Sequence, residues 1–151
     1  MPESPSDRRS EAWFSGIKTS PAGIETWFVI PIRRNSEPKD QHVAMLWGLL
    51  RNEVYKAAGG WTGPECTRVI RDLELLPGGW VNPATGKPQD DESRKYTVLV
   101  EESKVNDLAQ VLARATNSFD QLAILFVVQG EGRNVLQDLE KGYLEGDPAS
   151  G

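Results

Sequence analysis

The sequence has little of several residue types that build chemical sites. A single cysteine among 151 residues excludes a disulfide within the chain and a cysteine-cluster zinc or iron–sulfur site made by one copy. A single histidine, His42, is the one side chain of the type that titrates near neutral pH. No apolar run approaches the about 20 residues that a membrane-spanning helix needs. We therefore expect no metal site, no cofactor and no membrane span.

Positive charge is also in short supply. The chain has 17 Lys and Arg against 22 Asp and Glu, a net charge of −5, so its mean field repels nucleic-acid backbones and anionic membranes. The dense basic pairs are only Arg8-Arg9 and Arg33-Arg34, too short to follow a phosphate backbone. We expect neither a nucleic-acid nor a membrane partner. The first residues lack the apolar core of a secretion signal, which favours the cytoplasm.

The remaining composition suits one globular domain. Hydrophobic residues make up 38% of the chain and include five Trp, and a chain of this length buries roughly 68–70% of its unfolded surface. Residues 1–23 are rich in Pro, Ser, Arg, Glu and Gly, which predicts a flexible N-terminal arm. Residues 24–143 then form a single domain, and residues 144–151 a disordered C-terminal tail.

The first half of the domain predicts a strand followed by a long helix. Residues 26–32 are β-branched and aromatic, as strands prefer, and Pro31 should lie at an edge, a bulge or the end of that strand because it has no amide hydrogen. Asp40 can cap a helix whose apolar residues recur at three- and four-residue spacing. Gly59-Gly60 then ends the helix.

The second half is less regular. Residues 68–76 suit a helix and a strand about equally, and we favour a strand; Trp80-Val81 opens a short partner strand, and residues 82–88 form a loop. Residues 96–100 predict a strand, Ser103 caps a second amphipathic helix, and the apolar run 121–128 predicts a strand buried on both faces. A short amphipathic turn follows around residues 135–139.

This order is β-α-β-β-α-β. It predicts an α+β fold, a ferredoxin-like two-layer sandwich in which an antiparallel sheet carries both helices on one face. With only two helices available, the other face of the sheet must meet solvent, a second copy of the chain or a ligand. An exposed apolar sheet face usually marks an interface.

A set of turn and strand residues between residues 26 and 130 forms a pattern: Gly59-Gly60-Trp61-Thr62, Gly79-Trp80, Gly86, Ser93 and Phe119-Asp120-Gln121-Leu122-Ala123-Ile124. This pattern resembles small bacterial domains of unknown function with a ferredoxin-like build. The resemblance implies the fold alone, because that fold hosts many activities, and the insert from Pro64 to Pro77 departs from it.

Catalytic groups are few. His42 falls beside the apolar stripe of its helix and is either a surface histidine or an acid–base group, the latter requiring an orienting carboxylate and a dry pocket. No Gly-x-Ser-x-Gly elbow is present for a serine nucleophile. If the domain has a small-molecule pocket between the sheet and the helices, its candidate polar side chains are those of His42, Tyr96 and Gln121.

Two further motifs predict turns rather than sites. Asp90-Asp91-Glu92 lacks the spacing of a calcium loop and should form a solvated turn beside Arg94 and Lys95. Gly130-Glu131-Gly132 follows a strand but lacks the third glycine and the lysine of a phosphate loop, so we expect a turn there.

Aromatic residues are the better binding candidates. Trp13 and Phe14 form an apolar group with Ile17 in a polar arm, which either covers its own domain or binds a partner; the further candidates are Trp27, Trp61 and Trp80. Because catalytic groups are few and aromatic residues are enriched at interfaces, we expect a non-catalytic protein-interaction or self-association module that uses the exposed sheet face. The alternative is a small cofactor-free enzyme or small-molecule binder.

Overall fold

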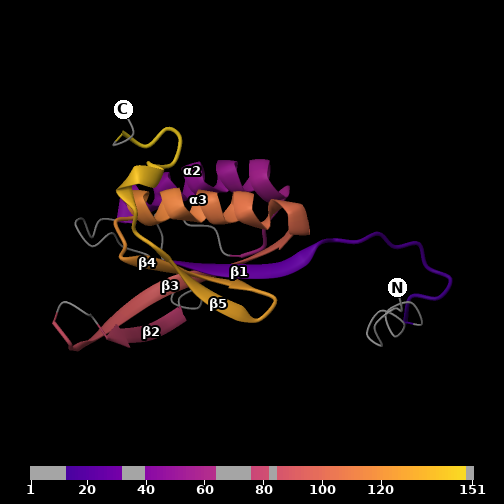
Figure 1. The fold of residues 1–151 in the computed structure, drawn as a ribbon, viewed down its shortest axis with the longest axis horizontal. Coiled ribbons are helices and arrows are strands. Elements are labelled where there is room, and N and C mark those ends of the chain that lie inside the picture. The colour runs from indigo at the N-terminus through magenta and orange to yellow at the C-terminus, as the bar shows by residue number, and fades with distance from the viewer. Residues whose placement is uncertain (1–12, 32–39, 64–75, 82–84, 149–151) are drawn as a thin grey trace.

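The computed structural model describes residues 13–31, 40–63, 76–81 and 85–148. In these residues the fold is α+β, with one antiparallel sheet of five strands and two α-helices (Figure 1). The elements in chain order are β1 (Ile24–Pro31), α2 (Asp40–Ala58), β2 (Leu76–Val81), β3 (Pro88–Val100), the 3-10 turn η2 (Glu102–Lys104), α3 (Val105–Ser118), β4 (Ala123–Val128), β5 (Glu131–Leu136) and the 3-10 turn η3 (Leu139–Lys141).

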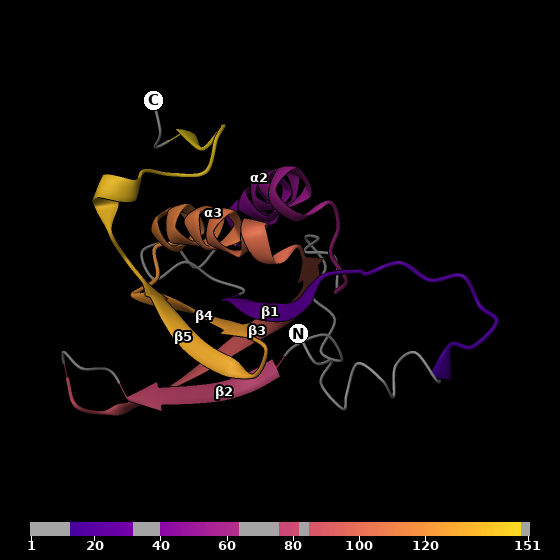
Figure 2. The same cartoon turned by 45° about the vertical axis from the view of Figure 1, so that its right-hand side comes forward.

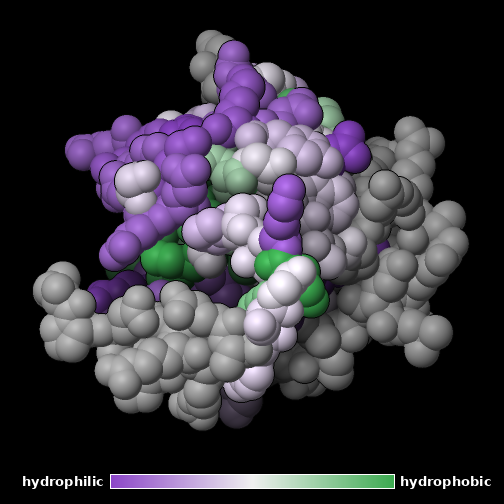
Figure 3. All heavy atoms as spheres, turned by 90° about the vertical axis from the view of Figure 1, so that its right-hand side faces the viewer, coloured by the Kyte–Doolittle hydropathy of each residue, from purple (hydrophilic) through white to green (hydrophobic). Residues whose placement is uncertain are grey.

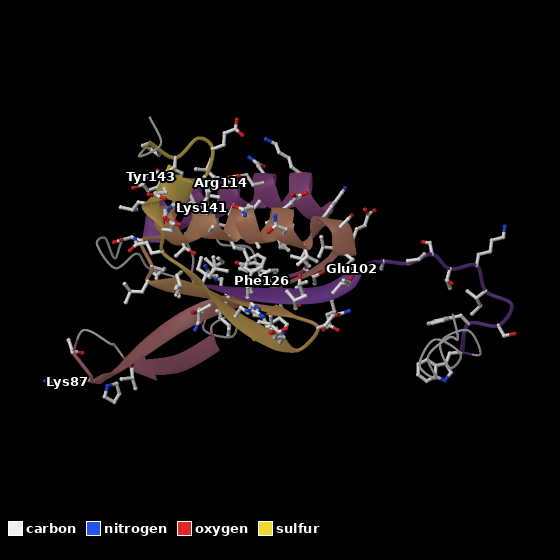
Figure 4. The ribbon with its side chains drawn as sticks, viewed as in Figure 1. Lys87, Glu102, Arg114, Phe126, Lys141 and Tyr143 are labelled. Carbon is white, nitrogen blue, oxygen red and sulfur yellow. The ribbon has the colours of Figure 1, made fainter. Side chains whose placement is uncertain are left out.

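The strands lie in the order β2-β3-β1-β4-β5, and every neighbouring pair is antiparallel. The register is fixed at Phe28 of β1, which pairs with Tyr96 on β3 and with Phe126 on β4. Helices α2 and α3 lie side by side over one face of this sheet (Figures 1 and 2). The core is the layer between them, and Phe126 lies there at 4% exposure (Figure 4).

Helix α2 confirms the predicted long helix. Leu46, Leu50 and Val54 are buried at three- and four-residue spacing, as an amphipathic helix requires. The helix ends before Gly59, whose φ of +82° lies in the left-handed region that glycine adopts without a steric penalty. The amide of Gly59 donates to the carbonyl of Tyr55 at 3.0 Å and closes the last turn.

The strands agree with the predictions in part. Pro31 is the last residue of β1, and Trp80-Val81 belongs to β2; residues 68–75 lie outside the described residues. The expected turn at 90–92 is wrong, because these residues lie inside β3, opposite the backbone of residues 77–79 on β2. Pairing with β2 gives these polar residues a hydrogen-bonded ladder, which overrides their low intrinsic preference for strands.

The end of the domain differs more from the prediction. Lys104, not Ser103, is the residue before α3, because η2 includes Ser103. The predicted turn is confirmed at Gly130 only: Gln129 and Gly130 have φ of +49° and +83°, as a tight two-residue hairpin requires, whereas Glu131 and Gly132 begin β5. The predicted amphipathic turn around residues 135–139 is wrong at its start, because Val135 and Leu136 lie in β5, which pairs along its whole length with β4. A turn does begin at Leu139, the first residue of η3.

The segment that begins at Leu144, predicted to be a disordered tail, starts inside the core. Leu144 has no exposed surface, and its backbone N–H donates to Ser118 Oγ at 3.0 Å. The side-chain amide of Asn117 donates to the carbonyls of Asp138 at 2.8 Å and Gly142 at 2.6 Å. Buried polar groups at the end of α3 therefore fix the backbone that delivers Leu144 to the core.

The N-terminal arm is exposed to solvent along its described length. Residues 13–23 are exposed, and the arm leaves the domain at the start of β1 (Figure 1). In the space-filling view, hydrophobic surface is confined to small areas among hydrophilic side chains (Figure 3). Among the residues described, no helix has the length and apolar character that crossing a bilayer requires.

Replacing Leu144 by Ala should lower the free energy of unfolding by about 2–5 kcal/mol, because it removes a fully buried side chain and leaves a cavity. Leu139→Ala is the matched control: Leu139 is 63% exposed and its loss should change stability by less than about 0.5 kcal/mol. Urea unfolding followed by circular dichroism measures both. Equal effects of the two substitutions would contradict the burial of the C-terminal segment.

Candidate functional site

The face of the sheet opposite the helices is the candidate site. Along β1, Thr26, Phe28 and Ile30 are buried toward the helices, so the intervening side chains point the other way. We call this side the open face. Its side chains on β1, β3 and β4 are Glu25, Trp27, Val29, Lys95, Thr97, Leu99, Leu125 and Val127.

Trp27 is the largest side chain of the open face. It pairs with Thr97 on β3 and with Val127 on β4, and Val127 pairs in turn with Gly132 on β5. All three neighbours are small, so the half-buried indole of Trp27 is not enclosed by its row. Lys95 Nζ lies 4.3 Å from the centroid of the Trp27 ring, a cation–π contact of about 0.5–1 kcal/mol at an exposed position.

The open face is apolar but not uniformly accessible. Leu99 is 46% exposed and Leu136, at the end of β5, is 67% exposed. Trp27, Val29 and Leu125 are half-buried, whereas Val127 is only 7% exposed. Accessible apolar side chains therefore extend from β3 across the sheet to β5, and Val127 on β4 is the buried exception.

An aromatic cluster lies on the opposite, helix-covered side. Trp47 of α2 stacks on Tyr96 of β3 with ring centroids 4.1 Å apart, and Trp61 meets Trp47 edge-on at 5.1 Å. We call these three residues the aromatic cluster. The indole N–H groups of Trp47 and Trp61 are buried, and among the described residues neither has a hydrogen-bond partner.

The loop that carries Trp61 is pinned to β3. Thr62 and Thr97 exchange two backbone hydrogen bonds of 2.8 Å. A Cβ on Gly63 would lie 2.5 Å from Tyr96 Cδ1, so only glycine lets this backbone approach the ring so closely. The sequence predicts Trp61 as a binding residue located in a turn. In the structure its ring packs against the core.

A partly buried ion pair between the helices, formed by Glu53 and Arg114, was missed from the sequence. The Glu53 carboxylate, 7% exposed as a residue, accepts from Arg114 Nε at 3.1 Å and from Arg114 Nη2. Its second oxygen accepts from the backbone N–H of Glu145 at 3.1 Å, and Figure 4 shows Arg114 on α3. Glu53 falls three residues after Leu50 on the apolar stripe of α2, and a carboxylate at that position is the signal that predicts a buried partner.

Two of the three candidate catalytic residues, Tyr96 and Gln121, are not brought together in the part of the chain that the structure describes. His42 lies in the first turn of α2, and its side chain is outside the described part of the structure. Tyr96 belongs to the aromatic cluster, while Gln121 Nε2 donates to the Phe119 carbonyl at 3.0 Å, near the end of α3. The sheet register separates Tyr96 from Gln121 by about two strand spacings and about five residues, roughly 19 Å.

The binding candidates fall into separate regions. Trp27 lies on the open face and Trp61 in the aromatic cluster, on opposite sides of the sheet. Trp13 and Phe14 of the arm are 69% and 49% exposed. Trp80 pairs through its backbone with residue 89, and its side chain is outside the described part. In that part, no three His, Cys, Asp or Glu side chains gather as metal ligands.

Comparisons with known proteins inform the fold. No family model matches the chain, and no curated protein matches it. Among solved structures, it is similar to a phage SAM lyase in complex with S-methyl-5′-thioadenosine, with a TM-score of 0.51 and 10% identity over 80% of this chain and 95% of that chain. At that identity the likeness concerns the fold alone.

Replacing Glu53 by Gln should lower the free energy of unfolding by about 1–3 kcal/mol, because the partly buried Arg114 guanidinium, whose side chain is 31% exposed, loses its counter-charge. Glu131→Gln is the control: its pair with Arg133 has side chains 69% and 76% exposed, and such surface pairs contribute about 0–1 kcal/mol. Thermal or urea unfolding compares the two variants. A Glu53 variant as stable as the Glu131 variant would show that the interhelical pair is not stabilising.

Proposed function

We propose that this protein is a non-catalytic self-association module that uses the open face of its sheet. The observation that carries the proposal is Trp27, a half-buried indole at the centre of a sheet face that neither α-helix covers. Tryptophan is among the residues most enriched at interface hot spots. An apolar face of this kind loses its contact with water when a second copy packs against it.

The fold proposal is a ferredoxin-like domain with one added strand. Supporting it, the four strands β2-β3-β1-β4 carry one helix after β1 and one after β3, all pairs being antiparallel. This is the β-α-β-β-α-β arrangement. The hairpin to β5 extends that sheet on the β4 side.

The exposed arm is a second element of the proposed interaction. Trp13, Phe14 and Ile17 are 69%, 49% and 64% exposed, which leaves three large apolar side chains in water. Because aromatic side chains bury about 150–250 Å² each, docking this segment on a partner adds roughly 400 Å² per arm. We propose that the arm docks at the margin of the associated copies.

The proposal predicts a mass that rises with protein concentration in sedimentation velocity. Trp27→Ala should weaken the association about tenfold or more, as loss of a hot-spot aromatic does. Tyr55→Ala removes an aromatic that is 50% exposed on α2 and should leave the association unchanged. Circular dichroism checks that both variants fold. A wild-type protein that stays monomeric at millimolar concentration would refute the proposal.

A second candidate function is small-molecule binding at the aromatic cluster, which the unpartnered indole N–H groups of Trp47 and Trp61 favour. Buried donors without acceptors are costly, and a ligand with acceptor atoms beside a planar ring would satisfy them. The ligand bound to the similar phage lyase, S-methyl-5′-thioadenosine, is one such probe.

Under this second proposal, S-methyl-5′-thioadenosine quenches tryptophan fluorescence and raises the melting temperature, because binding to the folded state stabilises it. Trp61→Phe, which removes the N–H and keeps a ring, should abolish most of the response. The Trp27→Ala variant should respond as the wild type does. No shift of the melting temperature at millimolar probe would count against small-molecule binding of this class.

A further inference from the structure

The charges of the open face are arranged around Trp27. Two residues that pair across β1 and β3 form a row. The row Glu25–Leu99 lies on one side of the row Trp27–Thr97, and the row Val29–Lys95 lies on the other. Glu25 and Lys95 are both exposed. Four residues separate these two charges along the strands, about 13 Å, and one strand spacing separates them across the sheet, about 5 Å.

Two identical faces can pack with a two-fold axis that lies in the plane between them. Aligned sheet packing keeps the strands of the two layers within about 30° of each other, so the axis runs either along the strands or across them. These two choices place the charges differently, and the register therefore discriminates between them.

A two-fold axis along the strands leaves the position of each charge along the strand direction, which we call its level, the same in both copies. It places Glu25 of one copy at the level of Glu25 of the other, and the two Lys95 side chains likewise. Like charges that face each other across an interface are unfavourable. An axis across the strands reverses the direction of β1 between the copies and places Glu25 of one copy at the level of Lys95 of the other, one strand spacing away.

We infer that two copies of this chain pack open face to open face about a two-fold axis across the strands at Trp27, with each Glu25 beside Lys95 of the other copy. This inference rests on the proposed self-association. The axis passes through the Trp27–Thr97 row, so the two indole rings meet there. Aromatic pairs in contact stabilise an interface beyond their buried area.

The area of the face indicates the strength of the contact. Five strands span about 19 Å and six residues about 20 Å, so the two faces together cover roughly 800 Å² before side-chain relief is counted. Stable interfaces bury about 1,200–2,000 Å². The two arms, at roughly 400 Å² each, bring the total to about 1,600 Å², which lies within that range, and we expect a reversible dimer.

Charge reversal tests the geometry with the intact chain. Glu25→Lys places two lysines opposite each other at both symmetric contacts, and Lys95→Glu does the same with carboxylates. Each variant alone should dimerise about tenfold or more weakly than the wild type, because like charges are opposed. An equimolar mixture of the two variants should form a heterodimer that associates more tightly than either variant alone, since both of its contacts then pair a lysine of one copy with a carboxylate of the other.

The control mixture separates geometry from net charge. Glu140 and Lys141 are exposed on η3, so Glu140→Lys and Lys141→Glu reproduce the same charge differences away from the open face. These variants should dimerise as the wild type does, alone or mixed. Sedimentation velocity at low salt, with one variant fluorescently labelled, follows every mixture because screening is weakest there.

The outcomes are distinct. Recovery of association only in the Glu25→Lys and Lys95→Glu mixture supports the two-fold packing across the strands. A wild-type dimer that depends on Trp27 but whose single charge-reversal variants dimerise normally, or whose mixture fails to recover, overturns this geometry while leaving self-association in place. A wild-type chain that never dimerises refutes the proposed function itself.

Discussion

The structure depends on a mismatch between its two layers: two helices can shield only one side of a five-stranded sheet. The shielded side holds the continuous core, from Phe28 and Tyr96 on the strands to Leu50 and Leu108 on the helices. The other side keeps apolar side chains in half-buried positions. Successive side chains of a strand point to opposite faces of the sheet. A strand with β-branched and aromatic residues at successive positions therefore has apolar side chains on both faces, and each face needs a layer that shields it from water.

Two further segments and one ion pair complete the packing on the helix-covered side of the sheet. Trp61 reaches in from the loop after α2, and Leu144 reaches in from beyond η3. The Glu53–Arg114 pair joins the two helices and also accepts the Glu145 backbone N–H. These contacts all lie on the helix-covered side, whereas on the open face Trp27 stays half-buried and Leu99 is 46% exposed.

The sequence predicts the elements best where the signal is local. The apolar spacing before Gly59-Gly60 and the turn at Gly130 are read correctly because periodicity and glycine conformation need no partner. The long β3 and the edge strand β5 are missed, since residues 90–92 and 131–136 become strands only through a neighbouring strand. Trp27 is among the predicted binding residues, but only tertiary packing places it on the opposite side of the sheet from Trp61. The Glu53–Arg114 pair likewise arises from tertiary packing alone.

The most direct test of the account is the solvent accessibility of Trp27 as a function of protein concentration, measured by hydroxyl-radical footprinting and mass spectrometry of the peptide that carries it. If the open face associates, oxidation of Trp27 falls as concentration rises, whereas oxidation of Tyr55, exposed on α2, stays constant. Oxidation of Trp27 that is independent of concentration, whether high or low throughout, would contradict a sheet face that becomes covered by a second copy.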